Sequence, residues 1–122
     1  VHVLTELPNG ARGIYHFSGV TRFGLGSQIH LYGSEGTLRY ELTPQERLLG
    51  ARVGDHELRE IPVPAAEQLG WRVEEEFVDA IRGAGRVEFT DFPAGVRYME
   101  FTEAVARSAA SRSPVELPLD VA

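Results

Sequence analysis

The chain has 122 residues, a formal net charge of −6 and no cysteine. This length is enough for one domain with its own core, and the missing cysteines exclude disulfides, a thiolate nucleophile and cysteine-based metal sites. All twelve basic residues are arginine, so no lysine is available for a Schiff base or for acid catalysis.

The charge balance and the hydropathy also limit the partners. An acidic chain without an arginine cluster is not expected to bind nucleic acid. No apolar run approaches the roughly 18 residues that a membrane span needs, so no membrane partner is expected. Residues 1–7 alternate like a strand and lack the order of a signal peptide, and with the lack of cysteine they favour a cytoplasmic location.

The first predicted element is a β-hairpin. Residues 1–7 and 11–18 alternate in hydrophobicity and flank Asn9-Gly10, the strongest short signal for a tight turn between strands. A two-residue turn pairs Pro8 with Ala11, and this pairing fixes the expected register of the whole hairpin.

Three histidines fall on predicted strands at a spacing of fourteen residues, namely His2, His16 and His30. If they lined up across the sheet, they would suggest a metal site. The expected register instead sets His2 opposite Phe17 and turns His16 to the other face. We therefore expect ordinary sheet histidines and no metal.

Four more strands are expected over residues 28–32, 37–42, 47–53 and 57–63. The alternation within residues 37–42 predicts an antiparallel sheet with one buried and one wetter face. Pro62 confines the last of these strands to a sheet edge, since proline cannot donate to the ladder.

Helices come last. Residues 71–83 carry apolar side chains at i, i+4, i+7 and i+8, and residues 91–112 form a second amphipathic stretch with Asp91 as its N-cap. Residues 87–90 and 115–117 are weaker strand candidates.

This order predicts an α+β fold, in which an open-faced, mainly antiparallel sheet has two helices packed on one face. The sequence contains no repeat and no linker, so residues 1–122 are expected to form a single domain.

The sequence offers no catalytic constellation. Residues 74–76 are three glutamates that spread over roughly 200° of a helix and cannot converge on one substrate. The glycines of residues 24–26 and 33–36 lack the strand–Gly-x-Gly-x-x-Gly–helix context of a dinucleotide site and are expected to form β-turns. We therefore predict no catalytic, cofactor-binding or metal-binding residue.

Two residues remain as candidates for the wall of a substrate pocket. Arg22 lies in a glycine-rich loop, where its planar donors could contact an anionic or polyol ligand. Trp71 opens a helix and could line a pocket. The alternatives are a plain surface residue for Arg22 and a core anchor for Trp71.

Four segments in order resemble the C-terminal part of the Gfo/Idh/MocA family, the relatives of glucose–fructose oxidoreductase and inositol dehydrogenase. Residues 7–13 resemble the family's strand–Asn-Gly-Ala–strand hairpin, and residues 29–38 its I-x-G-x-x-G-x-L turn. Residues 75–83 resemble its E-x-x-x-F-x-x-A-I-x-x-G helix, and residues 104–115 its closing helix and strand. The resemblance covers nearly the whole chain.

The chemistry of that family does not carry over to any position of this chain. There, an N-terminal Rossmann domain binds NAD(P) and holds the catalytic lysine in a Glu-Lys-Pro motif, and an Asp-x-x-x-His pair precedes the first strand of the sheet domain. This chain has no lysine and no Asp-x-x-x-His. NAD or NADP is therefore expected for a full-length parent and not for these residues.

The resemblance implies a C-terminal sheet domain of a larger NAD(P)-dependent oxidoreductase acting on a sugar, polyol or related substrate. Its expected role is to form part of a substrate wall and to join copies into a homo-oligomer through the open sheet face, with a Rossmann domain as its partner in the parent chain. The start at Val1 rather than Met fits a segment of a longer protein. The alternatives are a free-standing α+β module that binds a small ligand and a purely structural partner-binding domain.

Overall fold

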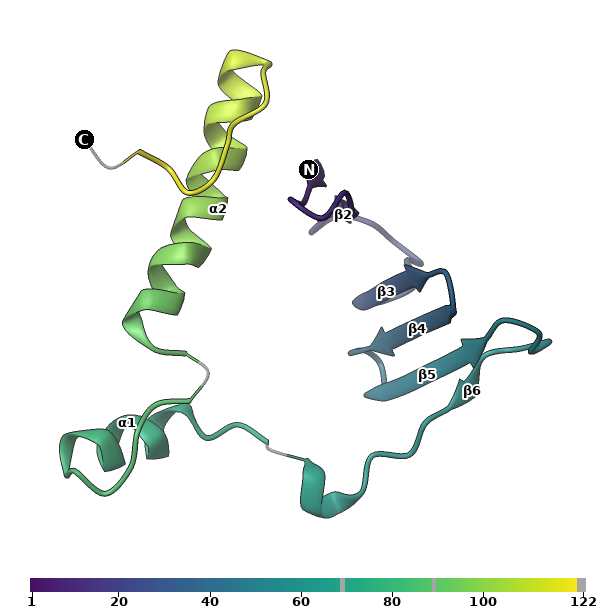
Figure 1. Ribbon diagram of the computed structural model, residues 1–122, viewed down its shortest axis with the longest axis horizontal. Coiled ribbons are helices and arrows are strands. Elements are labelled where there is room, and N and C mark those ends of the chain that lie inside the picture. The colour runs from purple at the N-terminus through teal and green to yellow at the C-terminus, as the bar shows by residue number, and fades with distance from the viewer. Residues whose placement is uncertain (69, 89, 121–122) are drawn as a thin grey trace. The chain divides into compact units, whose positions relative to one another are not determined.

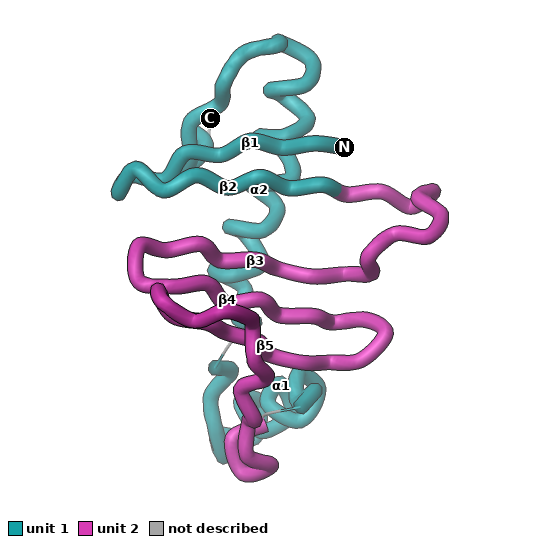
Figure 2. Tube along the Cα trace, turned by 90° about the vertical axis from the view of Figure 1, so that its right-hand side faces the viewer, with its two compact units in different colours: residues 1–16, 70–122 teal, residues 17–69 magenta. Residues whose placement is uncertain are grey.

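A computed structural model describes residues 1–68, 70–88 and 90–120. The chain divides into two compact units, residues 1–16 with 70–122 and residues 17–69 (Figures 1 and 2). The strands are β1 (His2–Glu6), β2 (Arg12–His16), β3 (Gln28–Gly33), β4 (Gly36–Glu41), β5 (Arg47–Arg52) and β6 (Arg59–Glu60). The helices are a short 3₁₀ helix, η1 (Ala65–Glu67), and two α-helices, α1 (Val73–Ile81) and α2 (Phe92–Ser111).

The predicted α+β class is confirmed, and every strand pair is antiparallel. The strands form two open sheets, however. One contains β1 and β2, and the other has the order β3-β4-β5-β6.

The turn of the first hairpin differs from the predicted one. The Leu7 amide donates to the carbonyl oxygen of Ala11 at 2.8 Å, and the Gly10 amide donates back to that of Leu7 at 2.8 Å. Gly10 has φ +83°, the left-handed conformation that closes a three-residue hairpin loop. Residues 8–10 therefore form the loop, and the predicted pairing of Pro8 with Ala11 is wrong.

This longer loop shifts the register by one residue. His2 lies opposite His16, not opposite Phe17 as predicted. Since residues opposite one another in a ladder share a face, His2 and His16 lie on the same side of the hairpin.

The second sheet has a protected edge at β6. This strand has only two residues, both charged, where the sequence predicted a strand over residues 57–63. The Ile61 amide still donates to the Leu48 carbonyl at 2.8 Å, but Pro62 has no N–H with which to extend the ladder. The edge position predicted for this segment is confirmed.

Register divides the second sheet into two chemically different faces. We call one the apolar face after its apolar side chains, which are Ile29, Leu31, Leu38, Tyr40, Leu48 and Ile61; the same register also places Arg52 and Arg59 on this side. We call the other the polar face, made of Gln28, His30, Tyr32, Thr37, Arg39, Glu41 and Arg47. Leu49, which is buried, lies on the polar face opposite Arg39.

The exposure of several side chains departs from the expected division into a buried apolar face and a wetter polar face. Ile29 and Leu31 are 53% and 61% exposed, whereas the side chains of Arg39 and Glu41 are only 29% and 17% exposed. Ion pairs hold these charged side chains close to the sheet. Residues 17–69, as far as they are described, contain no α-helix that could cover the apolar face.

Both α-helices begin and end near the predicted residues. Three glutamates lie in the first turn of α1, where the helix dipole favours negative charge. The Asp91 carboxylate caps α2 by accepting the Ala94 amide at 2.8 Å, and Arg112 ends α2 in a left-handed conformation. In the same unit, the Tyr15 and Phe101 rings lie 5.6 Å apart, so β2 contacts α2.

Two predicted strands did not form. Residues 115–117 are irregular between Pro114 and Pro118, neither of which can donate to a ladder. Within residues 87–90 the described positions are not in a strand, and Phe89 lies outside the described residues.

The cap of α2 can be tested through stability. Substitution of Asp91 by alanine removes the only side-chain acceptor described for the first-turn amides of α2, and we expect it to lower the free energy of unfolding by about 1 kcal/mol. The substitution Asp91→Asn keeps a good capping side chain and is the matched control. Urea unfolding followed by circular dichroism would check this. Equal losses in both variants would contradict the capping role.

Candidate functional site

The polar face carries a dense set of interacting polar side chains within the described part of residues 17–69. Along β3, His30 Nδ1 lies 2.9 Å from the Tyr32 hydroxyl, and His30 Nε2 lies 2.9 Å from Gln28 Oε1. Both contacts are within hydrogen-bond distance, and which ring nitrogen donates depends on the tautomer. The imidazole is thereby held at both nitrogens.

The next two strands add a charged cluster. Arg47 from β5 reaches Glu41 Oε2 with Nη2 at 2.5 Å and with Nε at 3.1 Å. Arg39 Nε lies 3.0 Å from Glu41 Oε1, but its N–H is not directed at that oxygen, so this contact is an ion pair without a hydrogen bond. One carboxylate thus lies between two guanidinium groups.

The two arginines change the pKa of the Glu41 carboxylate. The hydrogen bonds from Arg47 lower its pKa below the ordinary value, and the charges of Arg47, Arg39 and His30 act in the same direction. Partial desolvation opposes them, but the hydrogen bonds outweigh it.

This arrangement suits recognition better than catalysis. Two arginines against one glutamate leave a local excess of positive charge, and no hydrogen bond described for the chain uses the terminal nitrogens of Arg39. Donors and acceptors that are held by their neighbours on a sheet can orient hydroxyl or carboxylate groups of a small molecule. Of the side-chain pairs described on this face, Tyr32 with His30 most resembles an acid–base pair.

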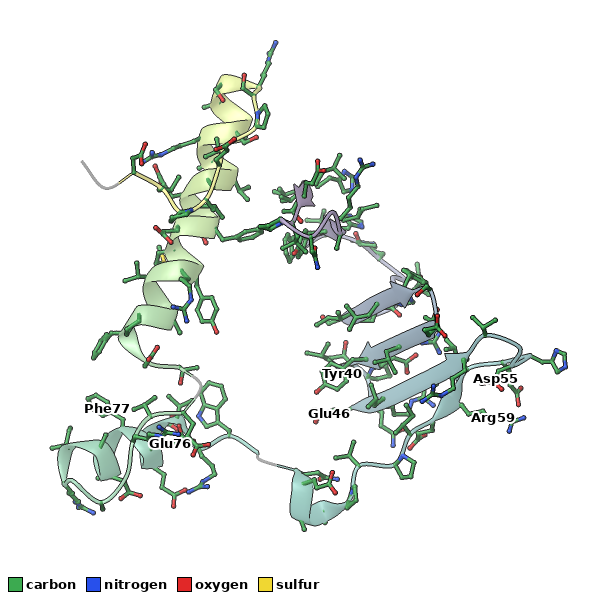
Figure 3. All side chains as sticks on the ribbon, in the orientation of Figure 1. Tyr40, Glu46, Asp55, Arg59, Glu76 and Phe77 are labelled. Carbon is green, nitrogen blue, oxygen red and sulfur yellow. The ribbon has the colours of Figure 1, made fainter. Side chains whose placement is uncertain are left out.

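A polar contact lies at one end of the apolar face. Tyr40 on β4 donates its hydroxyl hydrogen to a carboxylate oxygen of Glu46, which lies in the turn between β4 and β5 (Figure 3). This hydrogen bond, with desolvation and the charge of Glu46, raises the pKa of Tyr40. The contact ties the turn to the sheet.

The two residues predicted for a substrate wall belong to different units and lie outside the polar face. Arg22 lies exposed in the loop between β2 and β3. Trp71 is 79% exposed and donates its indole N–H to Glu74 at 2.7 Å, so the core-anchor alternative is wrong. The role of either residue at a substrate wall stays a prediction.

The glutamates of the α1 start diverge, as predicted. The Glu74 carboxylate accepts from Trp71, that of Glu75 from Arg72 at 2.9 Å, and that of Glu76 from the Glu88 amide at 3.1 Å. Because each carboxylate has a different partner, the three carboxylates do not converge on one point where they could act together as an acid–base group. The hydrogen bond from Arg72 also lowers the pKa of Glu75.

The glycine-rich segments do not fit a dinucleotide. Gly33 and Gly36 face each other across the β3–β4 turn, and Gly24 and Gly26 lie in the loop before β3. Neither segment leads into a helix whose N-terminus could receive a pyrophosphate. We assign no step of NAD(P) chemistry to these residues.

Sequence reasoning missed the polar face as a site. The alternation within residues 37–42 predicts a charged face that is wetter than the other, but it does not predict a site there. A signal was present, because Gln28, His30 and Tyr32 recur at the period of two that places strand residues on one face. Their pairing with Arg39 and Glu41 depends on the β3–β4 register, which β3 alone does not encode.

Among the hollows in the described parts of the chain are two open ones. One of about 980 Å³ follows α2 and is lined by residues that include Phe92, Val96 and Met99. The other, of about 420 Å³, lies beside the β4–β5 pair. Among residues 1–68, 70–88 and 90–120, no group of three or more histidine or acidic side chains is placed to hold a metal ion. None of the helices described has the length and apolar composition needed to cross a bilayer.

Comparison of the chain with protein-family models, with curated proteins and with solved structures gave no match.

The charged cluster predicts a pH-dependent stability. Since the folded-state pKa of Glu41 lies below its ordinary value, its stabilisation is complete above the ordinary carboxyl pKa and is lost as the pH falls through the lowered pKa. We expect the difference in unfolding free energy between the wild type and Glu41→Gln to shrink between about pH 7 and about pH 3. Urea unfolding across this range would measure it.

Glu67→Gln serves as the control for loss of one carboxylate, because Glu67 is exposed and has no ion pair among those described. A difference for Glu41→Gln that grows on acidification would contradict the prediction.

Proposed function

We propose that this chain is the C-terminal sheet domain of an NAD(P)-dependent oxidoreductase, and that it binds and assembles without catalysing the reaction. The observation that carries the proposal is the division of the β3–β6 sheet into a polar and an apolar face. The polar face would form part of a wall around a sugar, polyol or related substrate. The apolar face would join two copies of the chain.

The fixed side chains of the polar face support the substrate wall. His30 is held by Gln28 and Tyr32, and Glu41 holds two arginines in place. Groups that are already ordered lose little conformational entropy on binding, which favours weak but oriented contacts to a polar ligand.

The exposure of the apolar face supports self-association. Its side chains from β3 and β4 recur on neighbouring strands and are half exposed, with Ile29 and Leu31 the most open of them. Burial of one such side chain is worth about 1.5–3 kcal/mol. A two-fold arrangement places the same patch on both copies, so one apolar face covers the other.

The parent activity is supported by the sequence resemblance. Four segments in family order point to an oxidoreductase whose nucleotide and catalytic lysine belong to an upstream Rossmann domain. The lack of any lysine in this chain agrees with that division of roles. The purified chain is accordingly expected to show no NAD(P)H oxidation.

A free-standing ligand-binding module is the second candidate. The groove along α2 favours it, because its lining is largely apolar and includes Phe92, Val96 and Met99. In that case the ligand would contact α2 and not the polar face.

Self-association can be tested with two substitutions in the same strand. Leu31→Gln puts a polar group on the apolar face, and Tyr32→Gln changes an exposed residue on the opposite face. We expect Leu31→Gln to shift the chain towards the monomer, because the amide must lose its water in the interface, and Tyr32→Gln to associate like the wild type. Light scattering after size exclusion would measure the mass.

A wild-type chain that stays monomeric at high protein concentration would contradict self-association. Equal dissociation of both variants would place the interface elsewhere than on the apolar face.

Ligand binding can be located with two reporters that the chain provides. In a titration with D-glucose, myo-inositol and gluconate, we expect the ring resonances of His30 to shift, and gluconate to act most strongly because its carboxylate can pair with Arg39. His56, in the β5–β6 turn, is the internal control. Two-dimensional NMR would follow both rings and the methyl group of Met99, the single methionine.

Shifts at Met99 without shifts at His30 would favour the ligand-binding module. No shift at either position with millimolar ligand would contradict the substrate wall.

A further inference from the structure

The first hairpin brings two histidines together on one exposed face. His2 in β1 and His16 in β2 are opposite each other in the ladder, and the centres of their rings are 4.6 Å apart at an interplanar angle of 52°. Both residues are exposed, and the hydrogen bonds described for this unit involve neither ring. Their nitrogens are therefore available to a ligand.

The loop of the hairpin determines this pairing. Only the three-residue loop over residues 8–10 sets His2 against His16, whereas a two-residue turn would place them on opposite faces. The glycine at position 10 makes the loop possible through its positive φ. The pair is thus a consequence of the backbone and not of flexible side chains finding one another.

We propose that His2 and His16 form a binding site for a divalent first-row transition metal ion such as Zn²⁺, Ni²⁺ or Cu²⁺. Neutral imidazole nitrogen is a preferred ligand for these ions, at about 2.0–2.1 Å for zinc. Two nitrogens bound to one ion lie roughly 3–3.5 Å apart in tetrahedral geometry, and rings whose centres are 4.6 Å apart can present nitrogens at that separation.

The surroundings of the pair leave the metal open on its outer side. The next pair on the same face is Leu4 with Ile14, which are 79% and 81% exposed. Their apolar side chains supply no ligand to the metal ion and leave the histidine rings accessible to it. Two protein ligands leave the remaining coordination positions to water or to a group from another molecule. This site is independent of the polar face and of the proposed function.

Metal titration of the purified chain tests the proposal. With NiCl₂ or ZnCl₂ as the probe in isothermal titration calorimetry, we expect one saturable site in the wild type. Loss of a second-shell partner typically costs about 10–100-fold in metal affinity, so loss of a ligand in His2→Asn or His16→Asn should cost at least about 10-fold. His56→Asn, which removes an exposed histidine in the other unit, should bind like the wild type.

A second measurement on the wild type covers the case in which a variant fails to fold. NMR spectra of the four histidine rings during titration with ZnCl₂ should show changes at His2 and His16 and none at His30 or His56. The proposal is overturned if the wild type shows no saturable binding at millimolar metal, if both variants bind unchanged, or if the response is centred on His30 or His56.

Discussion

The pairing rule of antiparallel strands governs the sheet surfaces described for this protein. Opposite residues in a ladder share a face, so each register decides which side chains meet. In the β3–β6 sheet the register collects Gln28, His30 and Glu41 on one side and the apolar residues on the other. In the first hairpin it places His2 beside His16. A slip of one residue in either sheet would disperse these groups.

Within the polar face, Glu41 is the residue that holds the two arginines Arg39 and Arg47. Partial desolvation of a carboxylate is unfavourable, but the hydrogen bonds from Arg47 and the neighbouring charges outweigh it, which keeps the carboxylate ionised. The same cluster keeps Arg39 close to the sheet. Side chains that are already held in place lose little conformational entropy when a ligand binds. For this reason we propose the polar face as part of a substrate wall.

The proposed division between binding and chemistry agrees with the residues that the chain contains. It has no lysine and no cysteine, its α1 glutamates diverge to separate partners, and its glycine segments are turns and loops without a following helix. What it offers is a hydrogen-bonded sheet with two different surfaces. Such a sheet can position a substrate and a second subunit while another domain supplies the reacting groups.

The sequence by itself determined the features that depend on neighbours a few residues away. These are the two α-helices, the strands of the first hairpin and of β3 to β5, the Asp91 cap, the β6 edge and the divergence of residues 74–76, because capping, proline and helical spacing act locally. The tertiary structure alone decided the hairpin register, the exposure of Trp71 and the partners of Glu41. The register depended on whether the turn has two or three residues, a choice that the Asn-Gly signal leaves open. The other two depend on what other segments cover or contact, and spacing along the chain does not specify that.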